Sequence, residues 1–485
     1  MLSSAVIPLF ALLSGGQVPD EVPPPPQLLA VPTVEPKAEG PVPAVAPNVE
    51  DVVPAYVSEK KRMSEADKLK KREGVFVTGL PFFSSDPING VGGGATGYVH
   101  FNGRRTDRLF GYTPYTARLG LKGQYTTGSA GALAVKLDMP FVSGTAWRLQ
   151  VDAKYESSPN DLYFGLSEQS LQPFPEGRYS AYARRLATTR SGTGSEPSTV
   201  ADALKHRFLE HEWMLNVKAE RVLFDGNWRI LAGYEIQSLQ YRTFDGTTVD
   251  AKDATTGQDV RVANGTSLLS QDISQGRAFG MPGGRVSLLQ LSLMYDTRDY
   301  EPDPSRGVFV EFAQEHSSAY TGSQFTFHKM LLQGRFFAPL WSGTTARTVL
   351  ATRLGYGTII GPEAPFFEFQ DQWSAEGSIR ALGGSQTLRG FKANRFLGRS
   401  VAFSNIELRH RFADFSVWSQ NLSFAVVPFV DLGAIGDDVF GLKPVVKTSA
   451  GAGLRIGWNR STMVLLDVAA STEDTQFFIN FNNSY

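Results

Sequence analysis

The feature that most constrains this chain is a regular alternation of apolar and polar side chains, which runs from about residue 93 to the C-terminus. Between Leu289 and Tyr295, for example, every second side chain is apolar, and Gln290 and Ser292 lie on the opposite face. A repeat of two residues places alternate side chains on the two faces of a β-strand, whereas a helix would require a repeat near 3.6. The sequence therefore predicts an all-β body whose strands separate two different environments.

The faces opposite the apolar ones carry charges, and this favours a membrane barrel over a soluble sandwich. The charges occur along three predicted strands: Arg229 with Glu235, Arg347 with Arg353, and Glu407 with Arg409. A closed soluble core would not tolerate so many charges, whereas a water-filled lumen would. The strands have the length of about ten residues that a tilted bilayer crossing requires, and no apolar run approaches the ~20 residues of a membrane helix. We therefore predict a transmembrane β-barrel in the outer membrane of a Gram-negative-type cell.

The alternating segments divide into sixteen antiparallel strands within a barrel domain of residues 75–485. The strands are predicted at residues 93–102, 115–126, 131–139, 145–155, 161–168, 207–221, 228–241, 285–296, 307–316, 325–338, 346–357, 400–412, 422–432, 447–458, 461–470 and 475–485. The long connections 169–206, 242–284 and 358–399 all follow odd-numbered strands. Long outer loops and short periplasmic turns are the rule for outer-membrane barrels, so the count agrees with the predicted fold.

The segment before the barrel has three parts of different composition. Residues 1–16 are apolar and end in small residues, which predicts a signal peptide without the usual basic start; a buried strand or helix is the alternative. Residues 17–57 are rich in proline and are expected to form a disordered, extended tether. Residues 58–74 are charged and favour a short periplasmic helix, which is either solvated at the barrel entrance or else docks on, or plugs, the barrel.

The chain lacks the residue patterns that catalysis or cofactor binding would require. A formal net charge of −1, with lysines and arginines scattered, excludes a basic surface for nucleic acid. The absence of cysteine excludes thiolate metal sites and thiol catalysis, and the six histidines include no H-E-x-x-H pair. Residues 92–97 formally fit G-x-G-x-x-G, but this run begins a strand and not a helix. We therefore expect no enzyme activity, no cofactor and no metal.

The predicted loop 358–399 contains an unusual succession, Leu388-Arg389-Gly390-Phe391. It resembles the [V/I/L]-R-G-[F/Y] motif of the superfamily of BamA, TamA and the two-partner-secretion transporters, also called bacterial surface antigen barrels. In that family the motif lies in the sixth extracellular loop, which folds back into the barrel lumen. Further similar segments are the strand at 404–409, the F-x-D motif at 429–431, the G-x-G-x-R motif at 451–455, the turn at 295–299 with 304–307, and the terminal Tyr485.

The resemblance implies that Arg389 is held inside the barrel by residues of the strands that follow the loop. Phe429 and Asp431 lie on the face opposite Val426 and Val430, so they are expected to face the lumen. Because a guanidinium binds a carboxylate through two parallel hydrogen bonds, we predict an ion pair between Arg389 and Asp431. A solvated Arg389 is the alternative. The other lumen residues expected near this loop are Glu407, Arg409 and Arg455.

The resemblance also implies a function, namely insertion or translocation of a protein or lipid client through a lateral seam between the first and last strands. The residues expected at the seam are Gly92, Gly93, Gly94, Gly97, Phe477, Phe481 and Tyr485. Glycines pair weakly within a sheet, so this edge could open and template an incoming strand. The alternative function is a passive pore, or a structural or surface-interaction protein whose outward surface is formed by loops 169–206 and 242–284.

Two further expectations concern partners. Family members usually carry periplasmic POTRA domains, and residues 17–74 leave no room for one, so the chain resembles a POTRA-less branch of the superfamily. The expected partners are the lipid bilayer, the barrel-assembly machinery that would read the C-terminal aromatic residues, and a protein client or periplasmic partner that binds residues 17–74.

Overall fold

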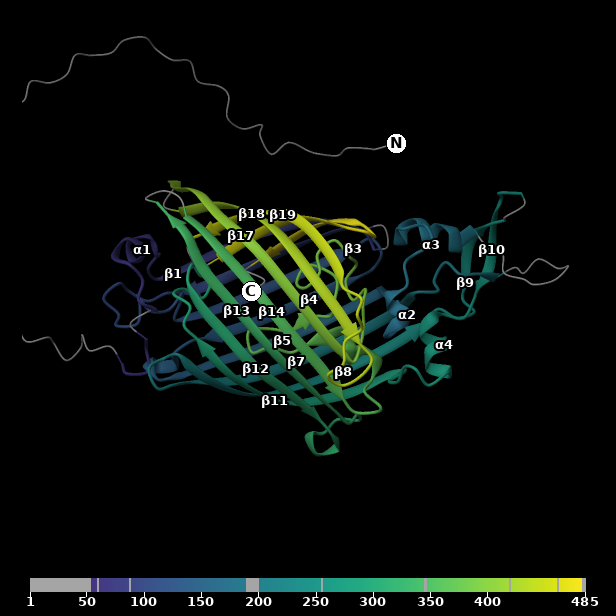
Figure 1. The fold of residues 1–485 in the computed structure, drawn as a ribbon, viewed down its shortest axis with the longest axis horizontal. Coiled ribbons are helices and arrows are strands. Elements are labelled where there is room, and N and C mark those ends of the chain that lie inside the picture. The colour runs from purple at the N-terminus through teal and green to yellow at the C-terminus, as the bar shows by residue number, and fades with distance from the viewer. Residues whose placement is uncertain are drawn as a thin grey trace, which may run out of the picture. The chain divides into compact units, whose positions relative to one another are not determined.

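The main element of the fold is a single antiparallel sheet of sixteen strands, each hydrogen-bonded to the next along the chain (Figure 1). The computed structural model describes residues 54–58, 61–86, 89–188, 200–253, 256–343, 347–417, 420–459 and 462–481, so the predicted signal peptide and nearly all of the tether lie outside it. The strands of the sheet are β1 (Val75–Asp86), β2 (Gly90–Phe101), β3 (Ala117–Thr126), β4 (Gly131–Met139), β5 (Trp147–Leu162), β7 (Arg207–Leu223), β8 (Trp228–Thr243), β11 (Gly283–Asp296), β12 (Gly307–Ser317), β13 (Phe327–Ser342), β14 (Arg347–Ile360), β17 (Ser400–Val417), β18 (Gln420–Gly436), β19 (Lys447–Trp458), β20 (Thr462–Ser471) and β21 (Thr475–Phe481). The predicted sixteen-stranded antiparallel barrel is confirmed.

The sheet has apolar side chains on its outer face and charged side chains on its inner face, the opposite of a soluble protein. In β8, Ile230 and Tyr234 point outward and are exposed, while Arg229 and Glu235 point inward and are buried. Apolar side chains on the outer face can contact lipid, and charged side chains on the inner face pair within the lumen. No helix among the described residues is long and apolar enough to cross a membrane.

Two of the predicted strands were assigned wrongly, and the errors cancel in the total. β1 (Val75–Asp86) was missed because Gly79 and Pro81 interrupt its alternation; a strand at the sheet edge tolerates proline because one side needs no ladder partner. The predicted strand 145–155 corresponds to the first part of β5, whereas the predicted strand 161–168 overlaps only the last two residues of β5, after its register shift between Ser158 and Asp161. The prediction omitted one strand, β1, and counted one strand too many at β5. Every strand after β5 therefore keeps its predicted position in the count, and the long connections still follow odd-numbered strands.

The predicted helix over residues 58–74 is wrong at both ends. The helix α1 spans only Glu65–Lys70, and the side chain of Ser64 caps it by accepting a hydrogen bond from the backbone nitrogen of Asp67. Lys71 leaves the helix in an extended conformation that leads into β1. The capping serine and this extended exit therefore limit the helix to six residues.

Residues 54–58 and 61–74 cross the periplasmic mouth of the barrel, at the end opposite α3 (Tyr179–Thr188) in Figure 1. They contact residues in or beside five periplasmic connections: Gly144, Gly226, Asp296, Gly111 and Asn421. Gly226 has a φ of +81°, and a Cβ on it would lie 2.5 Å from the backbone nitrogen of Ser58. Of the two alternatives for this segment, docking on the barrel is therefore the one observed.

Lys71 fastens this segment to the connection between β2 and β3. Its ammonium group donates hydrogen bonds of 2.7 Å to the carbonyl oxygens of Phe110 and Thr113 and lies 4.1 Å from the centre of the Phe110 ring. Burial lowers the pKa of Lys71 to about 7, against a smaller opposing effect of Asp107. The docked lysine thus releases its proton more readily than an undocked one.

We expect the docking of residues 61–74 to strengthen as pH rises from about 7 towards 10. In this window the undocked lysine holds a proton that the docked lysine lacks, which adds up to about 1.4 kcal/mol per pH unit. Hydrogen exchange of these amides, corrected for intrinsic rates, should show increasing protection. The Lys71→Met variant should lose this dependence, and protection that is flat or falling with pH in the native chain would contradict the assignment.

The connection 361–399 between β14 and β17, here called the inner loop, lies inside the barrel. It contains a 3-10 helix (Phe366–Gln370) and the short strands β15 (Asp371–Gln372) and β16 (Ile379–Arg380). Its apolar side chains Leu388, Phe391 and Phe396 are fully buried and belong to one core with Phe309 of β12. The extracellular connections contain the small elements α2 (Glu168–Leu171), α3, β6 (Val200–Ala201), β9 (Thr248–Lys252), β10 (Asp259–Asn264), α4 (Leu268–Ser274) and a 3-10 helix (Ala319–Thr321), and a further 3-10 helix (Val142–Gly144) lies in the periplasmic β4–β5 connection.

Candidate functional site

The predicted contact between Arg389 and Asp431 is present and is bidentate. The Nε and Nη2 atoms of Arg389 donate hydrogen bonds of 2.8 Å to the two oxygens of Asp431, and the backbone nitrogen of Arg389 donates a third of 3.1 Å. The guanidinium also lies 3.4 Å from the centre of the Phe429 ring. Because the side chain of Arg389 is only 2% exposed, the alternative of a solvated arginine is wrong.

The third nitrogen of the same guanidinium joins two more strands. Nη1 of Arg389 donates to Glu407 of β17 at 2.9 Å and to Asp467 of β20 at 3.3 Å. Arg409 and Arg455, both expected in the lumen, bond to Glu407 as well. The cluster therefore holds three arginines and three carboxylates, so the buried charges balance.

Asp467 was not predicted as a partner of Arg389, although the sequence carries a signal for it. It is the only charged residue of β20 (Thr462–Ser471), and its inward-facing carboxylate also binds Arg455. A single charge in an apolar strand must find a partner when it is buried. That rule indicates a lumenal ion pair but does not say which arginine supplies it.

The residues beside Arg389 fit the inner loop closely to β20. Gly390 has a φ of +91°, and a Cβ there would lie 2.9 Å from the backbone carbon of Ala470. The hydroxyl of Ser471 donates a hydrogen bond of 2.7 Å to the carbonyl oxygen of Gly390. Glycine is therefore required at this position by both conformation and space.

Arg395, in the same loop, forms a second anchor that the sequence did not single out. Its Nε and Nη2 atoms donate hydrogen bonds of 2.7 and 2.9 Å to Glu473 in the β20–β21 connection. It also bonds to the carbonyl oxygens of Ser170 and Gln172 in the β5–β7 connection. The inner loop is thereby joined to two extracellular connections.

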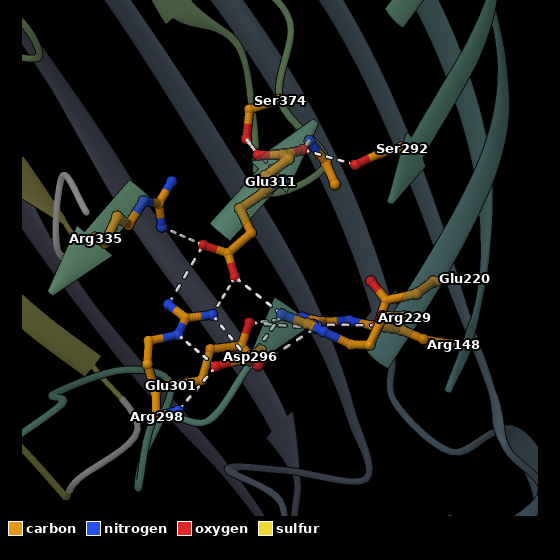
Figure 2. A network of polar contacts seen from close by, with 12 residues as sticks. Arg148, Glu220, Arg229, Ser292, Asp296, Arg298, Glu301, Glu311, Arg335 and Ser374 are labelled. Carbon is orange, nitrogen blue, oxygen red and sulfur yellow. Dashed lines mark hydrogen bonds and ion pairs between the residues drawn. The ribbon is translucent and has the colours of Figure 1, made fainter. Parts of the chain in front are cut away.

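A third anchor lies near the periplasmic end, where the cluster in Figure 2 connects the inner loop to the barrel wall. Glu376 of the loop pairs with Arg298 and Arg335, and Arg229 lies 3.5 Å from it. Arg298 and Arg229 share Asp296 at 3.0 and 2.8 Å. Lys61 of the N-terminal segment pairs with the same Asp296 at 3.3 Å, so this cluster also fastens the segment that crosses the periplasmic mouth.

The prediction that Gly92, Gly93, Gly94 and Gly97 lie at the seam is wrong, because these residues are not on an edge strand. These glycines belong to β2, which is paired along its length with β1 on one side and β3 on the other. Within the described residues the free edges belong to β1 and β21, because β1 pairs only with β2 and β21 only with β20. The error follows directly from the missed first strand.

Of the predicted seam residues near the C-terminus, Phe477 is fully described by the structure. Phe477 lies on β21 and is 60% exposed on the outer face. The backbone of Phe481 ends β21, but its side chain and Tyr485 lie outside the described residues. Towards the periplasmic end, the hydroxyl groups of Thr78 in β1 and Thr462 in β20 are 3.0 Å apart and join the two sides of the seam.

A cavity of about 840 Å³ lies at the seam. Its walls include outward-facing side chains of both edge strands, Phe83 and Phe477. They also include Tyr98, Lys136 and Asn480, which line a second cavity of about 300 Å³ inside the barrel. The seam cavity therefore leads from the outer face of the wall into the lumen.

Comparison with known proteins agrees with this architecture. A sequence profile of the Omp85 superfamily domain matches residues 117–476. The chain belongs to the Omp85 superfamily. As an Omp85 barrel of the BamA and TamA type, it resides in the cell outer membrane. A domain of unknown function, DUF5982, matches residues 53–116, which include β1 and β2, so the boundary between the two profiles falls inside the barrel.

Solved structures with a similar fold include two Omp85 barrels. BamA from Haemophilus ducreyi lacking POTRA domains 1–3 is 14% identical, with a TM-score of 0.47, and the match covers 85% of this chain and 70% of that one. CdiB from Escherichia coli is 11% identical, with a TM-score of 0.49, and the match covers 85% of this chain and 62% of CdiB. No curated protein matches the sequence.

Proposed function

We propose that this Omp85 barrel inserts or translocates a protein or lipid client through the seam between β1 and β21. The observation that carries the proposal is the cavity that passes between these two unpaired edges into the lumen. An edge strand presents free N–H and C=O groups that can pair with an incoming strand. Pro81 lacks an N–H, which favours a short or weak pairing along this edge.

The contents of the lumen argue against the alternative of a passive pore. Four groups of ion pairs, centred on Arg389, Arg395, Glu376 and Lys329, hold the inner loop in the barrel. The N-terminal segment lies across the periplasmic mouth. Both features block a straight path for solutes, so a steady large conductance is not expected.

A surface-interaction role is the second candidate, and one extracellular feature favours it. The strands β6, β10 and β9 form a separate three-stranded sheet that projects beside α3, away from the barrel (Figure 1). Extracellular connections with their own folded sheet are suited to binding another molecule. This role does not require the seam to open.

Locking the seam should abolish the function of the barrel in cells. The chain has no cysteine, so Phe83→Cys and Phe477→Cys can be joined selectively by a bifunctional maleimide. Both positions line the seam cavity from opposite edges. We expect the crosslink to change the protein and lipid content of the outer membrane as a gene deletion does, measured by quantitative proteomics and lipid analysis.

The matched control is a crosslink between strands that are already paired. Val99 of β2 lies opposite Leu119 of β3, so Val99→Cys with Leu119→Cys adds a bond without restricting the seam. This control should leave the outer membrane unchanged. If the locked seam also leaves it unchanged, transport through the seam is wrong and the surface-interaction role gains support.

A further inference from the structure

The outer part of the seam cavity is apolar and faces lipid. Phe83 of β1 is 81% exposed, and Phe477 and Ile479 of β21 are exposed beside it. On the outer face of a membrane barrel such side chains contact acyl chains. Because they border a gap between unpaired strands, an acyl chain can lie against both edges at once.

The inner part of the same cavity is cationic. Its charged lining residues are three lysines, Lys122, Lys136 and Lys392, against one carboxylate, Asp474. Lys392 pairs with Asp474 at 3.8 Å and Lys136 with Asp152 at 3.5 Å, which are long contacts for ion pairs. The charged residues that line this cavity are therefore mainly cationic.

Lys122 is the cation best placed to meet a ligand. It is exposed within the cavity, and its ammonium group lies 5.9 Å from the centre of the Phe82 ring. Among the described residues no carboxylate forms an ion pair with it, and Glu156, which pairs with Lys154 at 3.3 Å, acts on it only from a greater distance. An ammonium group in this position can gain an anionic partner without breaking an existing pair.

We propose that the seam cavity binds the phosphate-bearing headgroup of an anionic lipid, with its acyl chains on the outer face between β1 and β21. Lysine binds phosphate as a point charge, and the cavity volume falls in the usual range for small-ligand sites, about 300–1,000 Å³. The inference rests on the proposed function, because it names the client class of the same seam.

The position of the cavity along the strands selects the leaflet. β1 ends, and β21 begins, on the extracellular side, and the cavity is lined by residues near those ends, Phe83 and Thr475. The lipid therefore comes from the outward leaflet. An incoming protein strand would use the backbone edge of β1 and would not need the lysines, so the charge favours a headgroup.

Native mass spectrometry of the full chain, released from neutral detergent micelles, tests the proposal with four probes. They are dioleoyl phosphatidylglycerol, dioleoylglycerol with the same acyl chains, glycerol 3-phosphate, and a neutral strand-forming peptide. We expect retention of phosphatidylglycerol alone. Lys122→Gln should lower that retention about fivefold, the effect of one partly exposed ion pair, while the matched control Lys252→Gln on the extracellular strand β9 leaves it unchanged.

Each other outcome contradicts the proposal. Equal retention of phosphatidylglycerol and dioleoylglycerol would show apolar binding only, and glycerol 3-phosphate bound as tightly would show a phosphate site without a lipid. Retention of a neutral strand-forming peptide in place of the lipid, insensitive to Lys122→Gln, would make a protein strand the occupant. This assay uses the protein without the seam crosslink. A failure to bind the lipid would therefore contradict only this inference, whereas the proposed function is tested separately by the crosslink.

Discussion

Replacing Arg389 with alanine is expected to destabilise the barrel by about 3–5 kcal/mol, as removal of one partner from a buried ion cluster generally does. The substitution leaves Asp431, Glu407 and Asp467 without their shared guanidinium. Asp431 would keep only the side-chain amide of Asn405, at 2.8 Å, among its described side-chain partners. Heat-modifiable electrophoretic mobility should show unfolding at a lower temperature and less folded protein in the membrane fraction.

The controls for this prediction separate charge from geometry. Arg389→Lys restores the charge but not the two parallel hydrogen bonds to Asp431, so its stability should fall between those of the native and alanine proteins. The double variant Arg389→Ala with Asp431→Asn removes one orphaned charge and should be more stable than Arg389→Ala alone. A native unfolding temperature for Arg389→Ala would mean that the buried cluster does not hold the loop.

Glu376→Ala should have an effect of similar size, because it removes the only carboxylate that the inner loop offers to the cluster in Figure 2. Arg298 would keep Asp296, and Arg229 would keep Asp296 and Glu220. Arg335 would lose its only ion-pair partner among the described residues. A buried arginine left without a carboxylate costs about 3–5 kcal/mol. Hydrogen exchange should report faster opening of the inner loop around residues 371–380.

A double-mutant cycle isolates the pair in this second prediction. Arg335→Leu with Glu376→Leu removes both charges, so the double variant should be less destabilised than the sum of the two single variants. Additive effects within about 0.5 kcal/mol would show that the two side chains are not coupled. In that case the loop must be held at this end by other contacts.

The parts of this fold that follow from local rules could be predicted from the sequence. Alternation revealed the sheet, its sidedness and nearly all of its strands because a strand with lipid on one side and charge on the other repeats every two residues. The pairing of Arg389 with Asp431 was predicted through the resemblance of residues 388–391 and 429–431 to the family motifs, and alternation added only that Asp431 faces inward. These inferences depend on single strands or single side chains.

What depends on several distant segments could not be predicted. The ion pairs that Arg389, Glu407, Arg455 and Asp467 share connect four segments, the inner loop and the strands β17, β19 and β20. The sequence does not specify the register of these segments. β1 was missed because an edge strand with a glycine and a proline lacks the pattern of a fully paired one, and the predicted seam moved to the wrong strand with it. The N-terminal segment docks through contacts with residues beside periplasmic connections that are far apart in the sequence, such as Asp296 and Asn421.

The distance across the seam is the measurement that tests this account most directly. Spin labels on Phe83→Cys and Phe477→Cys, in the otherwise cysteine-free chain in lipid, report that distance by pulsed electron paramagnetic resonance. Unpaired edges predict a broad distribution of distances, in contrast to a narrow one for labels at Val99 and Leu119 on the paired strands β2 and β3. A distribution at the seam as narrow as that of the paired strands would contradict the central claim that this Omp85 barrel opens between β1 and β21.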